Sequence, residues 1–335
     1  MSVRLSRRHL PSVSSPPWWG LLLPVFLIMA SCSVEPGYSG AQPGLRDFIR
    51  RSYDKIEVRI PMRDGVHLFT SIYSPKDQSR AYPILMRRTP YGVGPYGDRS
   101  FPETLGPSPV LTREGFIFVL QDVRGAYMSE GAFVNMRPHR PEKSGPSEID
   151  ESTDTYDTIE WLLANLDNHN GRVGQWGISY PGGYASMGAV SRHPALAAVS
   201  PQAPTTDWFI GDDFHRHGAF TLLLGAGFYP SFGKPRPEPT TQSEWRNSLL
   251  QTPPMDMYEF YLREGTPADL DAKYFDGQLR FWNEIIEHPN YDTFWQDRNV
   301  LPHLTDLKTA VMAVGGWFDA EDPYGPLATY QAAEK

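Results

Sequence analysis

Residues 171–183, GRVGQWGISYPGG, carry the strongest indication of chemistry in the chain. Ser179 follows a short apolar run there and precedes a tyrosine and further glycines. A serine on a sharp strand-to-helix turn exposes its hydroxyl above the sheet, and the helix N-terminus beside it can stabilise negative charge. Such a turn needs small neighbours, and Gly177 stands two residues before the serine. Pro181 stands two residues after it, so the strict G-x-S-x-G pattern is not met, and an ordinary serine on a glycine-rich turn is the alternative interpretation.

The segments around Ser179 predict a sheet that could hold such a serine. Short apolar runs that end in turn residues indicate buried strands; they occupy residues 82–92, 115–125, 173–177, 196–204 and 309–319. A hairpin is expected over 56–75, and helices over 154–166 and 184–190. Strands that alternate with helices are typical of a doubly wound, mostly parallel α/β sheet.

The interval 206–305 breaks this alternation. It is dense in aromatic residues and proline, and it contains amphipathic stretches such as QLRFWNEIIEH. It is therefore predicted to be a mostly helical cap, inserted between a first core part at 48–205 and a second at 306–335. The aromatic residues of the cap are expected to be mostly core, with one or two free to line a substrate pocket.

The N-terminus reads as a targeting segment. Arginines precede the apolar run WWGLLLPVFLIMA, which is too short to span a bilayer comfortably, and small residues then lead to Cys32. This pattern predicts a lipoprotein signal over 1–31, lipid on Cys32 and a flexible tether over 32–47; a plain secretory signal is the alternative. The mature protein is expected to be exported, as a periplasmic or outer-membrane lipoprotein. Cys32 is the single cysteine, so an intramolecular disulfide is excluded.

The composition and net charge argue against one class of binding partner, nucleic acid. Forty per cent hydrophobic residues indicate a globular protein, and a net charge of −8 without a basic run in the body argues against nucleic acid. The chemistry expected of Ser179 needs no cofactor. The sequence leaves open whether copies of the chain associate into a homo-oligomer.

Several spaced motifs add a family resemblance. GISYPG matches a G-x-S-Y-x-G elbow, and five further stretches follow the same family order: RRTPYG, QDVRGAYMSEGAF, DTIEWL, HPNYDTFW and GGWFDAEDPYG. Residues 53–335 thereby resemble the X-Pro dipeptidyl-peptidase and cocaine esterase-like (CocE/NonD) serine hydrolases, and most of all their α-amino acid ester hydrolase and glutaryl-cephalosporanate acylase branch. The resemblance implies an α/β-hydrolase fold with a helical cap. The family's C-terminal β-sandwich domain is expected to be missing.

The resemblance also implies roles for individual residues. Asp319 would be the catalytic acid, and the backbone N–H of Tyr180 and the side chain of Tyr91 would form the oxyanion hole. A carboxylate cluster would hold the substrate's α-ammonium group; its members would be Asp213, Glu321 and Asp322. Asp212 is the neighbouring alternative to Asp213.

Two other interpretations stay open for residues 212–217, where the chain enters the cap. Carboxylates and imidazoles could bind a metal ion there; the candidates are Asp212, Asp213, His215 and His217. The same residues could instead be a solvated entrance without a binding role. No metal is expected, because their spacing matches no defined metal motif.

The sequence offers no general base at the position that a serine mechanism expects. The α/β-hydrolase order is nucleophile, acid, histidine, and no histidine follows Asp319. His303 precedes the acid and would break that order, and His193 is expected to be structural. The chain is therefore expected to be a fragment or a natural truncation that hydrolyses very little by itself.

The expected activity is acyl transfer from an α-amino acid ester or amide, through an acyl-enzyme on Ser179, to water or to an amine such as a β-lactam nucleus. An X-Pro dipeptidyl peptidase is the enzymatic alternative, because it also binds an ammonium group. A non-catalytic binding lipoprotein is the alternative from another class.

Overall fold

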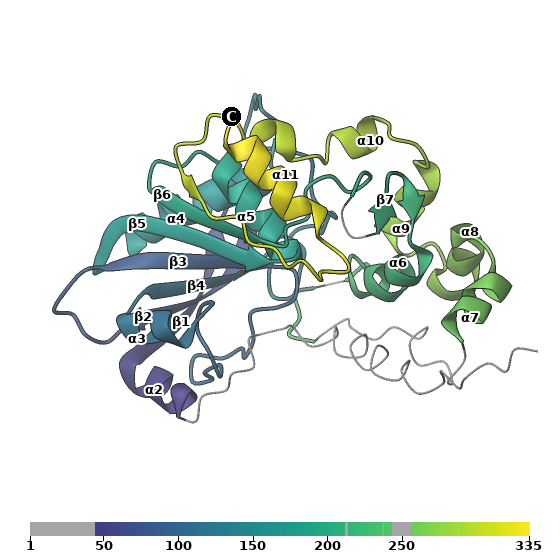
Figure 1. The fold of residues 1–335 in the computed structure, drawn as a ribbon. Helices are drawn as coiled ribbons and strands as arrows, with labels where there is room; N and C mark the ends of the chain where they lie inside the picture. Colours follow the sequence, from purple (N-terminus) through teal and green to yellow (C-terminus); the bar gives the residue numbers. More distant parts are fainter. Residues whose placement is uncertain (1–43, 212–213, 237, 243–255) are drawn as a thin grey trace, which may run out of the picture. The chain divides into compact units, whose positions relative to one another are not determined.

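The computed structural model describes residues 44–335 except 212–213, 237 and 243–255. A seven-stranded sheet with the strand order β1-β2-β4-β3-β5-β6-β9 lies at its centre (Figure 1). The strands are β1 Tyr53–Pro61, β2 His67–Pro75, β3 Tyr82–Thr89, β4 Ile117–Asp122, β5 His169–Ile178, β6 Leu196–Gln202 and β9 Ala310–Val311. From β4 to β9 all neighbours are parallel, whereas β1, β2 and β4 pair antiparallel. The predicted mostly parallel sheet and its N-terminal hairpin are confirmed.

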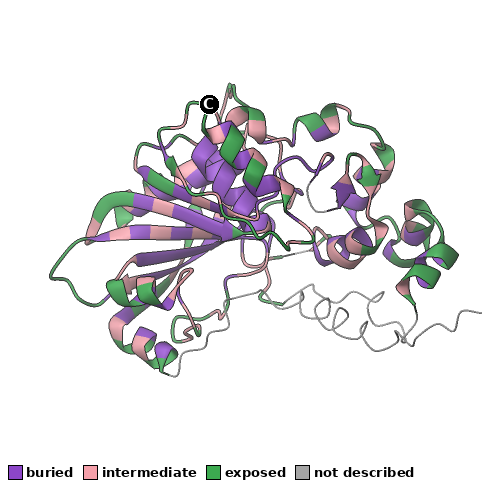
Figure 2. Cartoon of the chain, in the orientation of Figure 1, coloured by how far each residue is buried: buried purple, intermediate pink, exposed green. Residues whose placement is uncertain are grey.

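Helices lie on both faces of this sheet, as the doubly wound prediction requires. They are α2 Leu45–Ser52, α3 Pro109–Glu114, α4 Glu151–Asn165, α5 Tyr180–Val190 and α11 Tyr324–Ala333. Side chains alternate along β4, so Ile117 and Val119 join the core beneath α4 and α5, and Phe118 and Leu120 join the cluster that contains Leu45 of α2. Figure 2 shows α5 buried throughout its length.

Two boundary observations refine the expectations for the N-terminal part. Helix α2 begins at Leu45, which lies inside the range expected to be tether. None of the described helices is both long enough and apolar enough to cross a bilayer. The signal segment and Cys32 lie outside the described residues.

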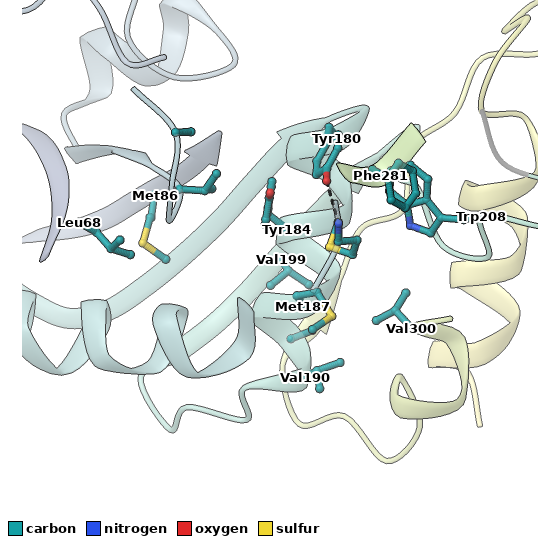
Figure 3. Close-up of a cluster of buried hydrophobic side chains, with 14 of the residues drawn as sticks. Leu68, Met86, Tyr180, Tyr184, Met187, Val190, Val199, Trp208, Phe281 and Val300 are labelled. Carbon is teal, nitrogen blue, oxygen red and sulfur yellow. Dashed lines mark hydrogen bonds between the residues drawn. The ribbon is translucent and has the colours of Figure 1, made fainter. Parts of the chain in front are cut away.

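The regular elements that the structure describes between β6 and β9 are mainly short helices. They are β7 His215–Arg216, β8 Ala219–Phe220, α6 Leu222–Phe228, η1 Tyr229–Ser231, α7 Met257–Glu264, α8 Pro267–Leu270, η3 Asp271–Phe275, α9 Arg280–Glu287, α10 Thr293–Gln296 and η4 Leu301–His303. The aromatic rings of this interval pack against the core: Trp208 meets Tyr180 at 5.5 Å and Phe281 at 5.8 Å between ring centroids (Figure 3). Most of these rings are therefore core, as expected.

The last core strand is shorter than the sequence predicts. Residues 309–319 were expected to form a buried strand, but the ladder to β6 covers Ala310–Val311 only, followed by one isolated bridge at Val314. β9 pairs with β6 on one side, and within the described residues no strand pairs with its other side. A strand held on one side leaves its continuation to solvent, and Trp317 and Phe318 are 90% and 101% exposed.

Candidate active site

Ser179 occupies a strained turn between β5 and α5. Its backbone has φ 61° and ψ −128°, a conformation that costs a non-glycine residue about 1–3 kcal/mol. The turn is fixed on both sides: the Ser179 N–H donates to the Gln202 carbonyl at 2.9 Å, and the Ser179 carbonyl accepts from the Gly182 N–H at 2.7 Å. This is the geometry of a nucleophile elbow, which projects the hydroxyl from the carboxyl edge of the sheet.

The glycines around Ser179 are required by contact with backbone. A Cβ on Gly177 would lie 2.1 Å from the Pro181 carbonyl oxygen, and one on Gly182 would lie 2.5 Å from the Gln202 carbonyl oxygen. Pro181 is accepted because the first turn of a helix needs no donor at that position. The glycine that the strict motif places two residues after the serine is thus needed one residue later, where α5 meets the end of β6.

Both predicted oxyanion donors lie at the same edge of the sheet as Ser179. Tyr180 is the first residue of α5, and its side chain is buried (Figure 3). Its phenol donates to Asn135 Oδ1 and accepts from the Met136 N–H, each at 2.9 Å. The phenol therefore has structural partners, and the predicted oxyanion role concerns the Tyr180 backbone N–H alone. Tyr91 follows β3, and its ring packs on Phe232 at 5.7 Å.

Asp319 follows the last strand, on the other side of Ser179 from Tyr91. Its Oδ1 accepts from the backbone N–H groups of Glu321 at 2.9 Å and Asp322 at 3.1 Å. Because β6 lies between β5 and β9, the strands that lead to Ser179 and Asp319 are roughly 10 Å apart. In a serine triad, a histidine lies between the nucleophile and the acid.

The two histidines considered in the sequence are held elsewhere. His193 Nε2 pairs with Glu160 at 2.8 Å, which agrees with its predicted structural role. The His303 ring packs on His139 at 4.6 Å, and burial lowers its pKa. Other described imidazoles also have partners away from Ser179 and Asp319: His67 with Glu130, His169 with the Leu163 carbonyl, and His288 with Asp292.

An arginine that the sequence analysis did not single out ties the cap to the loop after Asp319. Arg216 Nη2 donates to the carbonyls of Ala320 at 3.0 Å and Glu321 at 2.8 Å. Gly211 approaches the same loop, because a Cβ there would lie 2.6 Å from the Tyr324 ring. The signal was present in FIGDDFHRHGAF, where Arg216 follows the acidic pair.

The predicted carboxylates are described only in part. Asp322 is buried at 2% exposure and Glu321 is partly buried, both in the loop that Arg216 holds. Asp212 and Asp213 lie outside the described residues. Their flanking residues, Gly211 and Arg216, both contact the segment 320–324.

A buried aspartate provides a second tie within the cap. Asp207 Oδ2 accepts from the Tyr291 hydroxyl and from Asn299 Nδ2, each at 2.8 Å, and Asp207 Oδ1 accepts from the Phe209 N–H. Tyr291 belongs to the stretch HPNYDTFW, so that motif supports the cap entrance. Its sequence gave no indication of which residue it would bind.

Two of the four metal-ligand candidates, Asp212 and Asp213, lie outside the described residues. Among the residues that are described, no group of three His, Cys, Asp or Glu side chains could hold an ion. His215, one of the four candidates, is buried with its ring 4.8 Å from that of Trp295 and 5.2 Å from that of Phe209. Its surroundings are those of a core residue.

Burial of His215 predicts acid sensitivity of the cap. Burial lowers the pKa of His215 to about 4, so the unfolded chain takes up a proton first as the pH falls. The contribution to stability is present above pH about 6.5 and is lost as the pH falls towards 4, by up to about 3 kcal/mol. We expect the free energy of unfolding of His215→Phe, measured in urea from pH 7.5 to 4.5, to fall less with decreasing pH than that of wild type.

The exposed His217 in the same turn supplies the control for this prediction. His217→Asn is expected to keep the wild-type dependence on pH, because Asn tolerates the left-handed backbone found there. Equal slopes for His215→Phe and wild type would show that His215 does not govern acid unfolding.

The sheet order and the strand-to-helix elbow at Ser179 are those of the α/β-hydrolase fold. The chain matches the X-Pro dipeptidyl-peptidase (S15) family over residues 64–335, and it belongs to that family. Cocaine esterase from Rhodococcus sp. (strain MB1 Bresler) is 29% identical over 272 residues, which are 78% of this chain and 43% of the esterase.

Two solved structures are similar over 84% of this chain. One is an α-amino acid ester hydrolase, with 34% identity, a TM-score of 0.70 and 45% of its chain covered. The other is an aminopeptidase from the marine sediment archaeon Thaumarchaeota archaeon, with the same identity and TM-score and 46% covered. The chain thus spans less than half the length of each of these relatives.

Proposed function

We propose that this chain carries the nucleophile and acid of a serine hydrolase that acts on α-amino acid esters or amides. The observation that carries the proposal is Ser179 on its strained elbow, in a chain of the S15 family. The hydroxyl would attack the carbonyl carbon, and the Tyr180 N–H and Tyr91 would stabilise the resulting oxyanion. The bond to the alcohol or amine would then break, this group would leave with the proton that Ser179 gives up, and the acyl-enzyme would remain. Water or an amine would then release the acyl group.

The substrate class rests on the loop after Asp319. Glu321 and Asp322 would hold the substrate's α-ammonium group together with Asp213, since carboxylates bind ammonium through charge-assisted hydrogen bonds. Arg216 supports the part of this assignment that concerns Glu321 and Asp322, because it donates to the Ala320 and Glu321 carbonyls and so holds their loop. The similar α-amino acid ester hydrolase structure favours the same class.

The first test is covalent labelling of the nucleophile. A fluorophosphonate probe is expected to modify Ser179 slowly, because no histidine follows Asp319 in this sequence, and Ser179→Ala should remove this labelling. The control Ser200→Ala changes a hydroxyl that bonds the Met312 carbonyl at 3.1 Å, and it should label like wild type. Mass spectrometry of the labelled peptide reads the site directly.

Labelling of Ser179 would also exclude the alternative that the chain is a non-catalytic binding protein. A non-catalytic lipoprotein predicts no reaction at Ser179 in the wild-type chain at neutral pH. Labelling that is equal in wild type and Ser179→Ala would assign the reaction to another residue and end the proposal.

The X-Pro dipeptidyl peptidase alternative is favoured by the name of the family. Both activities need an ammonium-binding acidic pocket, so the carboxylates do not separate them. Paired assays with an α-amino acid ester and an X-Pro anilide do: faster cleavage of the anilide would replace the ester or amide proposal with the peptidase.

For localisation, we propose an exported protein held by lipid on Cys32. The supporting pattern is the basic, apolar and small-residue sequence that ends at this cysteine. Incorporation of a palmitate analogue into the wild-type protein, and its loss in Cys32→Ala, would support the anchor. Lipid-free wild-type protein in the soluble fraction would contradict it.

A further inference from the structure

Two buried residues hold the phenol of Tyr180, the residue that directly follows Ser179. The phenol donates to Asn135 Oδ1 and accepts from the Met136 N–H, each at 2.9 Å. Asn135, Met136 and Tyr180 are 4%, 3% and 0% exposed. Because a buried polar group that loses its partner is costly, these two bonds restrict the phenol to one position.

The segment that supplies these partners is itself fixed. Arg298 Nε donates to the Asn135 carbonyl at 3.3 Å, and the guanidinium carbon of Arg298 lies 3.6 Å from the centroid of the Phe294 ring. Met136 has φ 29°, a left-handed backbone that a non-glycine residue keeps only where its surroundings impose it. Asn135 and Met136 therefore form a support for Tyr180 that does not simply follow its movements.

The same segment lies against the first turn of α5, which forms the elbow. A Cβ on Gly183 would lie 2.8 Å from Met136 Cε, so Met136 packs closely on this turn. The N–H groups of Gly182 and Gly183 both donate to the Ser179 carbonyl, at 2.7 and 3.1 Å. Met136 thus contacts the turn that presents Ser179 at two places, the Tyr180 phenol and Gly183.

Fixing the phenol also fixes the backbone of Tyr180. The ring packs on Tyr184 at 5.2 Å and on Trp208 at 5.5 Å, and only two side-chain torsions, each with a few preferred values, separate it from the Cα. A hydrogen-bond donor stabilises an oxyanion best at about 2.7–3.1 Å. A shift of the Tyr180 backbone by a few tenths of an ångström would therefore weaken the predicted oxyanion hole.

We infer that Asn135 is a positioning residue of the proposed acyl transfer. By accepting from the phenol it fixes Tyr180, and with it the backbone N–H that stabilises the oxyanion. The inference rests on the proposed function, and it assigns Asn135 a role through Tyr180 rather than on the reacting atoms. Asn135 lies two residues after the stretch QDVRGAYMSEGAF, so this part of the chain would serve the elbow.

Amide NMR of the intact chain reads the Tyr180 N–H directly. The sequence contains two Ser-Tyr pairs, Ser52–Tyr53 and Ser179–Tyr180, so labelling with ¹³C-carbonyl serine and ¹⁵N-tyrosine gives two signals in an HNCO spectrum. Asn135→Ala removes the acceptor and is expected to shift the Tyr180 signal, while the Tyr53 signal stays in place as the internal control. Asn135→Asp retains an acceptor oxygen and should restore the wild-type position.

The fluorophosphonate rate tests whether this position matters for reaction, because the phosphoryl oxygen of the probe takes the place of the oxyanion. Normalised to folded protein, the rate should fall about tenfold in Asn135→Ala, since the expected shift is smaller than the roughly 1 Å that can cost a hundred-fold. Asn135→Asp should recover most of the rate. Tyr180→Phe keeps the ring, removes the same bond and should match Asn135→Ala, including where Asn135→Ala does not fold.

Tyr53→Phe is the matched control for lost stability, because it removes a buried phenol that donates to the Thr112 carbonyl at 2.7 Å, and it should label like wild type. An unmoved Tyr180 signal in Asn135→Ala, or a rate no lower than that of Tyr53→Phe, overturns the inference while the hydrolase proposal stands. If wild-type Ser179 does not label, the hydrolase proposal fails. The Tyr180 signal then still supports the anchoring by Asn135 if it shifts, and overturns it if it does not.

Discussion

Gly177→Ala is expected to destabilise the protein by about 3 kcal/mol or more and to abolish labelling of Ser179. A Cβ at this position would lie 2.1 Å from the oxygen and 2.3 Å from the carbon of the Pro181 carbonyl. Real Cβ atoms do not approach backbone this closely, so the first turn of α5 must move, and overpacking against backbone exceeds the usual 1–3 kcal/mol. A displacement of about 1 Å at a nucleophile can cost a hundred-fold in rate.

Urea unfolding and the fluorophosphonate rate, normalised to folded protein, measure the two effects of Gly177→Ala separately. The matched control is Gly227→Ala in α6, where an added Cβ meets nothing within 4 Å and alanine favours the helix by up to about 1 kcal/mol. Wild-type stability and labelling in Gly177→Ala would show that the elbow tolerates a side chain and that its tight geometry is not needed.

Arg88→Met is expected to lower the free energy of unfolding by about 3–5 kcal/mol. Arg88 is fully buried, with Nε on Gln121 at 2.8 Å, Nη1 on the Glu151 carbonyl at 2.8 Å, and Nη2 3.4 Å from the Glu151 carboxylate and 3.5 Å from that of Asp154. Removing one partner of a buried ion cluster leaves charge without compensation. Burial already raises the pKa of Glu151, so without Arg88 the charged form of this carboxyl would be the one most destabilised.

A rescue variant distinguishes lost charge from lost packing. Arg88→Met combined with Glu151→Gln should recover part of the stability, because the orphaned charge is removed, while Asp154 keeps its 2.7 Å pair with Arg124. Arg280→Met, which breaks an exposed i,i+4 pair with Glu284, is the control and should cost about 0.5 kcal/mol or less. A loss below about 1 kcal/mol in Arg88→Met would mean that water or a neighbour replaces the guanidinium.

Much of the core could be predicted from local patterns. Alternating apolar runs and turn residues located β3, β4, β5 and β6, and the helical spacing before Leu166 located α4. These features follow from contacts a few residues apart, so they are readable in the chain itself. The serine on its turn was readable for the same reason, because Gly177 and Pro181 act within one helical turn of Ser179.

The segment from residue 309 to the loop after Asp319 could not be predicted from local patterns. The apolar stretch 309–319 predicted a full buried strand, yet the ladder stops after Val311, because the extent of a strand depends on what pairs with each side of it. In the sequence, nothing distinguishes Arg216 from the other polar residues of FIGDDFHRHGAF. Only the folded chain shows that it holds carbonyls more than a hundred residues away.

The sequence by itself determined the type of sheet, the order of its elements and the residue that stands at the nucleophile elbow, since period and turn chemistry act locally. The tertiary structure decided which groups meet: Arg88 with the carboxylates of Glu151 and Asp154, and Arg216 with the carbonyls of Ala320 and Glu321. Such pairings depend on strand order and on side-chain burial between distant segments, and no local pattern specifies them.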